Sequence, residues 1–162
     1  MPKTIVGIGG LAATNIPGAS IRTLALGSCI AIVLLHPRSR TVGMVHVALP
    51  ESKTNKKKSE SKPGSFVDTG VPALIKLMQE NGCDSNIKSF RIKIAGGACV
   101  LDPNNVFNIG KNNLIAAKKL LWSLGTGAVS EDTGGNISRN VEVEVDTGKV
   151  VISSAGRGSW EI

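Results

Sequence analysis

Two apolar segments separated by a short polar turn constrain the fold of this chain most strongly. Residues 30–35 form a continuous apolar run rich in β-branched side chains, and residues 42–49 form a second segment that stops at Pro50. A continuous run of this length is typical of a strand buried on both faces of its sheet. The residues between the two segments begin with His36 and Pro37. They indicate a turn, because proline restricts the backbone to a conformation that turns favour. The pattern predicts a buried β-hairpin with His36 as a surface turn residue.

The predicted hairpin brings Cys29 close to His46 if its turn is centred between Arg38 and Ser39. In that register His46 lies opposite Ala31, and Cys29 lies two positions before Ala31 on the same face of the sheet. Diagonal neighbours of this kind have backbones about 7–8 Å apart, a gap that a thiol and an imidazole can largely close. A slip of one residue would place the two side chains on opposite faces, so the hypothesis depends on the turn.

A thiol beside an imidazole indicates a nucleophilic site. A free thiol has a pKa of about 8.5, and a neighbouring histidine can lower it and accept its proton. Cys29 follows Gly27 and Ser28, and backbone N–H groups in such a tight segment could face a developing oxyanion. The spacing alone leaves a plainer alternative open, in which Cys29 and His46 are ordinary core residues.

The remaining pattern predicts a layered fold. Residues 72–80 and 111–124 have the periodicity of amphipathic helices, the second capped by Asn112 or Asn113 and packed through Leu114, Ala117, Leu121 and Leu124. Residues 90–94, 141–145 and 150–152 read as strands, the last two as a hairpin. We expect an α/β (α+β) fold, a mixed or antiparallel sheet covered by helices, in a single domain over residues 1–162.

The positive charge of the chain is concentrated in one segment. Lys and Arg number 19 and Asp and Glu number 12, a formal net charge of +7. Residues 51–64 hold five lysines against Glu51 and Glu60 and contain almost no apolar side chain. We expect a mobile, solvated loop at 51–64, with contact to an acidic partner as the alternative. Aromatic residues make up only 3% of the chain, which argues against a base-stacking surface for nucleic acid.

The cysteines indicate a reducing compartment. Cys29, Cys83 and Cys99 are odd in number, so they cannot form a fully paired disulfide framework. Neither the cysteines nor His36 and His46 have the spacing of a zinc site, so we expect no metal. No apolar run reaches the roughly 18 residues of a membrane helix, and the first residues do not resemble a secretory signal. We therefore expect a soluble cytoplasmic domain without membrane insertion.

Several motifs along the chain are recognisable. The most specific pair is T-L-A-L-G-S-C-I-A-I-V-L at 23–34 and G-M-V-H-V-A-L-P at 43–50. Further motifs are K-I-A-G-G-A at 93–98, I-G-K-N-N at 109–113, D-T-G-G at 132–135 followed by Ser138-Arg139, and D-T-G-K-V at 146–150. Together they resemble the signatures of the CheD family, the chemoreceptor glutamine deamidases.

This resemblance implies a function and a set of residues. The family fold is related to papain-like cysteine hydrolases and to the catalytic domains of deamidating toxins. The nucleophile would be Cys29, the base His46 and the orienting residue Thr23, with no cofactor. The substrate would be glutamine side chains on the cytoplasmic helices of chemoreceptors. Some members also hydrolyse receptor glutamyl methyl esters, and members bind the phosphatase CheC.

Two other functions compete with this hypothesis. A catalytically quiet relative would act as a binding module for a CheC-type phosphatase, which intact Cys29, His46 and Thr23 argue against. A basic polyanion-binding protein would bind through Lys53–Lys62 in a salt-dependent manner.

Overall fold

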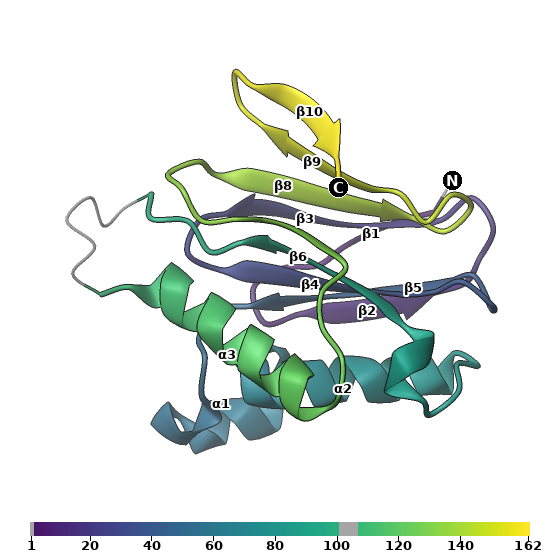
Figure 1. Ribbon diagram of the computed structural model, residues 1–162, viewed down its shortest axis with the longest axis horizontal. Coiled ribbons are helices and arrows are strands. Elements are labelled where there is room, and N and C mark those ends of the chain that lie inside the picture. Colours follow the sequence, from purple (N-terminus) through teal and green to yellow (C-terminus); the bar gives the residue numbers. More distant parts are fainter. Residues whose placement is uncertain (1, 101–106) are drawn as a thin grey trace.

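The computed structural model, which describes residues 2–100 and 107–162, contains two five-stranded sheets that pack face to face (Figure 1). The first sheet has, in spatial order, β1 (Lys3–Ile5), β3 (Ser20–Leu26), β8 (Arg139–Glu144), β9 (Val150–Ser154) and β10 (Gly158–Glu161). The second has β2 (Leu11–Thr14), β5 (Thr41–Val47), β4 (Ile30–His36), β6 (Arg91–Gly96) and β7 (Ser130–Thr133). The β1–β3 and β6–β7 pairs are parallel, and the other neighbours are antiparallel.

Helices cover the outer face of the second sheet (Figure 1). They are α1 (Lys56–Ser61), α2 (Val67–Glu80) and α3 (Ile109–Ser123), with short 3₁₀ turns at Ser52–Thr54, Pro63–Ser65 and Ile87–Ser89. Within the described ranges, no helix is long and apolar enough to cross a membrane.

Strand β4 is the centre of the structure because both of its faces are buried. Ala31, Val33 and Leu35 pack between the two sheets. The alternate residues, Ile30, Ile32 and Leu34, pack against the helices. All seven residues of the strand are buried, which confirms the prediction from its continuous apolar run. The layered α+β class is also confirmed, although the pattern did not reveal that a second sheet would cover the first.

The helices differ from the predicted ones at their ends. Helix α2 begins five residues before Pro72, at Val67. Helix α3 begins at Ile109, and its N-cap residue is Asn108, so the prediction of a cap at Asn112 or Asn113 is wrong. Asn113 instead lies on the buried face of α3 and is fully inaccessible.

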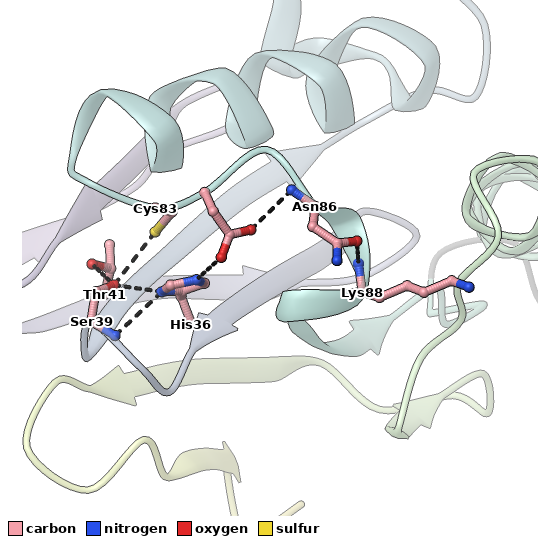
Figure 2. Close-up of polar contacts among 7 residues, drawn as sticks. His36, Ser39, Thr41, Cys83, Asn86 and Lys88 are labelled. Carbon is pink, nitrogen blue, oxygen red and sulfur yellow. Dashed lines mark hydrogen bonds and ion pairs between the residues drawn. The ribbon is translucent and has the colours of Figure 1, made fainter.

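His36 is not the surface residue that its place beside Pro37 predicted, since only 3% of it is exposed. Its ring lies against Ser39 near Cys83 (Figure 2), where the Ser39 N–H donates to Nδ1 at 3.3 Å and the Ser39 Oγ lies 2.6 Å from that nitrogen. Because Nδ1 accepts, Nε2 carries the ring proton and donates to Asp84 at 3.2 Å. These bonds let the ring stay buried at the end of β4 opposite to Cys29.

The lysine-rich segment contains helical turns that its composition did not predict. The side chain of Asn55 caps α1 by accepting a hydrogen bond from the Lys58 N–H at 3.0 Å. Asp68, in the first turn of α2, accepts from the Ser52 N–H at 2.9 Å and from the Ser52 Oγ at 2.7 Å. The mobility of residues 51–64 stays a prediction.

Candidate active site

A hydrogen bond between the two sheets joins two of the three predicted site residues. Thr23 lies on β3 of the first sheet and His46 on β5 of the second, and both side chains are buried between the sheets. The Thr23 Oγ1 and the His46 Nδ1 are 2.7 Å apart. Residues 23 positions apart in sequence thus meet because the sheets pack face to face.

The Val6 carbonyl oxygen determines where the protons lie in the hydrogen bond between Thr23 and His46. The Thr23 hydroxyl donates to the Val6 carbonyl oxygen at 2.7 Å, and that oxygen can only accept. Because the hydroxyl has one proton, its oxygen must accept the other bond from a protonated Nδ1 of His46. The neutral ring therefore carries its proton on Nδ1 and has a free lone pair on Nε2. Nε2 is buried, and no described residue hydrogen-bonds to it.

The N-terminal segment fixes the backbone of His46 as well. The Gly9 N–H donates to the His46 carbonyl oxygen at 2.7 Å, and the His46 N–H donates to the Gly10 carbonyl oxygen at 3.0 Å. Gly9 has a φ of +75°, a conformation that glycine adopts without strain. The sequence analysis did not predict that the N-terminal segment holds the His46 backbone. The glycine-rich start of the chain was the signal that could have indicated it.

Cys29 lies on the same side of the hairpin as His46. The structure pairs Ala31 with His46 and Ile30 with Val47, which confirms the predicted register. Cys29 comes directly before β4 and packs at the edge of the core between the sheets. No hydrogen bond connects its sulfur to the His46 Nε2 in the described structure. Cys29 and His46 are therefore diagonal neighbours on one face, with the imidazole lone pair free.

Cys29 also lines a cavity of about 780 Å³ at this end of the sheets. The walls come from the segment before Cys29, the chain after β6, the start of α3 and the loop after β7. The lining is mainly apolar, with Ala98, Phe107 and Leu114 among its side chains. The half-buried thiol is therefore open to a substrate that enters the cavity.

The D-T-G-G motif and Arg139 hold one wall of this cavity. Arg139 is buried and donates from Nε to the Asp132 carboxylate at 3.0 Å and from a terminal nitrogen to the Gly134 carbonyl oxygen at 2.9 Å. The Gly134 N–H in turn donates to the Gly96 carbonyl oxygen at 2.9 Å. The ion pair between the buried Arg139 and the half-buried Asp132 thus fixes the glycine loop against the end of β6.

Burial shifts the pKa of both reactive groups toward their neutral forms. It raises the pKa of the Cys29 thiol, an effect that a hydrogen bond from its own backbone N–H partly offsets. It lowers the pKa of the His46 imidazole. At neutral pH the resting site therefore holds a thiol and a neutral imidazole, so that His46 can act as a base.

Among the residues that the structure describes, no group of three His, Cys, Asp or Glu side chains could hold a metal ion.

Comparison with known proteins identifies similar chains. Residues 48–154 match the family described as CheD chemotactic sensory transduction. A protein of Syntrophotalea carbinolica, named probable chemoreceptor glutamine deamidase CheD, is 49% identical over 162 residues, the full length of both chains. The chemoreceptor glutamine deamidase CheD of Thermotoga maritima is 38% identical over 158 residues, which cover 96% of this chain and 94% of that protein. The first alignment spans Thr23, Cys29 and His46, which precede the family match.

Gly96 generates a prediction about how the Cys29 backbone is held. Its φ is +106°, and an added Cβ would collide with the Cys29 carbonyl oxygen. Gly96→Ala should therefore displace Cys29 and change the rate at which iodoacetamide alkylates its thiol, measured by mass spectrometry of the Cys29 peptide.

Gly125→Ala is the matched control, because Gly125 also has a positive φ, +81°, but an added Cβ there meets nothing within 4 Å. Both variants should lose about 1–3 kcal/mol of stability through backbone strain. Equal alkylation rates in the two variants would contradict this view of Gly96.

Proposed function

Since this chain belongs to the CheD family, we propose that it deamidates glutamine side chains of chemoreceptors to glutamate, with Cys29 as nucleophile, His46 as base and Thr23 as orienting residue. The observation that carries the proposal is the hydrogen bond from the His46 Nδ1 to Thr23, which leaves Nε2 unprotonated in a residue whose register places it on the same hairpin face as Cys29. An imidazole held in this tautomer can take a thiol proton directly.

The first half of the reaction forms an acyl-enzyme. The Nε2 of His46 takes the proton of the Cys29 thiol while the sulfur attacks the side-chain amide carbon of the glutamine. Backbone N–H groups near Cys29 are the candidates to stabilise the oxyanion. The imidazolium then gives its proton to the amide nitrogen, the C–N bond breaks, and ammonia leaves a thioester on Cys29.

The second half releases the product. A water molecule takes the place of ammonia, His46 removes its proton, and the oxygen attacks the thioester carbon. The C–S bond breaks, and the thiol regains its proton as glutamate leaves. A glutamyl methyl ester would give the same thioester with methanol as the leaving group, so methylesterase activity is compatible with the same residues.

The proposed context follows from the family and from the cavity. The substrate would be the cytoplasmic helices of chemoreceptors, and their glutamine side chains would enter the cavity that Cys29 lines. We place the protein in the cytoplasm, acting as one domain over residues 1–162, with a CheC-type phosphatase as a further partner. The free thiols of Cys29 and Cys83 are compatible with that reducing compartment.

The direct test is deamidation of a purified cytoplasmic fragment of a chemoreceptor. The wild-type protein should raise the mass of selected glutamine-containing peptides by about one dalton each, as expected when an amide becomes an acid through an acyl-enzyme. Cys29→Ala should remove this activity, and His46→Ala should lower its rate by about 10²–10⁴-fold.

Cys83→Ala serves as the control, because Cys83 is buried beside Ser39 at the other end of β4. It should keep the wild-type rate. A wild-type protein that deamidates no glutamine, or a Cys29→Ala variant that is fully active, would contradict the proposal and favour the binding-module alternative.

The pKa shifts predict the acid side of the pH profile. His46 must be neutral to act as a base, and burial lowers its pKa from the ordinary value of 6.5. The kcat/KM for deamidation should therefore stay high as the pH falls to 6.5 and decline only below it. A midpoint clearly above 6.5 would contradict a neutral resting imidazole, because the ring would then bind its proton more tightly than a free imidazole does.

A further inference from the structure

A buried asparagine on α3 reaches both segments that carry the reactive groups. Asn113 is fully inaccessible, and its Nδ2 donates to the Ser28 carbonyl oxygen and to the Ala48 carbonyl oxygen, each at 3.0 Å. Ser28 directly precedes Cys29, and Ala48 lies two residues after His46. One amide group therefore connects the two segments.

The two hydrogen bonds of Asn113 lie just beyond the point where the pairing between β4 and β5 ends. The pairing of β4 with β5 ends at Ile30 and Val47, so Ser28 and Ala48 are beyond the last paired residues. From there the chains turn to different neighbours: the Gly97 N–H donates to the Cys29 carbonyl oxygen, and the Ala48 N–H donates to the Ser65 carbonyl oxygen. Asn113 thus bridges the two chains at the point where they separate.

The chemistry of the contact requires an amide. A carbonyl oxygen only accepts hydrogen bonds, and an amide NH₂ offers two donors for the two carbonyls. Among the described residues, the buried Oδ1 of Asn113 has no hydrogen-bond partner, which costs about 1–3 kcal/mol that an apolar side chain would avoid. The two donated bonds are the evident compensation for this cost.

Two glycines let α3 come close enough for this reach. An added Cβ on Gly110 would lie 2.5 Å from the Gly97 carbonyl oxygen and 2.7 Å from that of Ala98. An added Cβ on Gly97 would lie 2.7 Å from the Leu114 side chain. The start of α3 is therefore in direct backbone contact with the segment that follows β6 and pairs with the Cys29 loop.

From this geometry we propose that Asn113 is a positioning residue, which holds the Cys29 loop against the end of β5 and so keeps the thiol in reach of the His46 Nε2. The inference rests on the proposed roles of Cys29 and His46. Asn113 acts through these two segments and not on the substrate.

The test compares Asn113→Asp with Asn112→Asp. The first replaces the donor by an oxygen that faces two carbonyl oxygens, whereas the second adds the same charge to an exposed neighbour on α3. Asn113→Asp should lower the kcat for deamidation about 10-fold or more and leave KM within about twofold, because the proton transfer suffers and not the binding. Asn112→Asp should match the wild type in both.

A second measurement separates positioning from mere stability. Iodoacetamide alkylation of Cys29 is followed for each variant alone and combined with His46→Ala. If Asn113 works through the Cys29–His46 pair, Asn113→Asp should slow alkylation in the presence of His46 and have no further effect in the His46→Ala background. An equal slowing in both backgrounds, or none in either, would overturn the proposal.

Asn113→Ala covers the case in which Asn113→Asp does not fold, because it removes both bonds without adding a charge. If neither variant folds, the role of Asn113 is structural and the proposal is wrong. The alkylation comparison needs no receptor fragment, so it still decides the role of Asn113 if the wild-type protein deamidates nothing and the proposed function itself fails.

Discussion

The single proton of the Thr23 hydroxyl is the constraint on which the site depends. The Val6 carbonyl oxygen can only accept a hydrogen bond, so the Thr23 hydroxyl donates its proton there. The hydroxyl oxygen must then accept a hydrogen bond from the His46 Nδ1. One buried oxygen thereby ties the N-terminal segment, the first sheet and the second sheet together. It also selects the ring tautomer in which Nε2 is free. A threonine can thus orient a catalytic imidazole without a carboxylate, and burial of the pair keeps the ring neutral.

The layers of the fold supply the parts of the site separately. Thr23 comes from β3, His46 from β5, Cys29 from the segment before β4, and the proposed positioning residue Asn113 from α3. Strand β3 is irregular beside the site, since its register against β8 shifts between Thr23 and Leu26. Within this bulge Ala25 has a φ of +56°, and its N–H donates to the Asn140 side chain at 2.9 Å. Bulges and left-handed residues are common next to active sites, where they redirect the chain.

Sequence reasoning succeeded where the signal was local and failed where the contact was distant. The register of the hairpin followed from one turn and from alternation, so the pairing of Ala31 with His46 was predictable. The short or polar strands β1, β7 and β10 carry no such pattern, and with them the two-sheet architecture was hidden. Asn113 resembled a helix cap by its position, and His36 resembled a turn residue by its neighbour Pro37. Each of them has a partner far away in the sequence: Ser28 and Ala48 for Asn113, and Asp84 for His36. The role of Thr23 came from motif resemblance alone.

The protonation state of His46 decides whether its imidazole can take the proton of the Cys29 thiol. Nitrogen-15 NMR of the imidazole at neutral pH distinguishes the two neutral tautomers and the imidazolium form. We expect a proton on Nδ1 and none on Nε2 in the wild-type protein, and a loss of this preference in Thr23→Val, where the accepting oxygen is gone. A proton on Nε2, or a fully protonated ring, would contradict this expectation, because the imidazole would then have no lone pair for the Cys29 thiol.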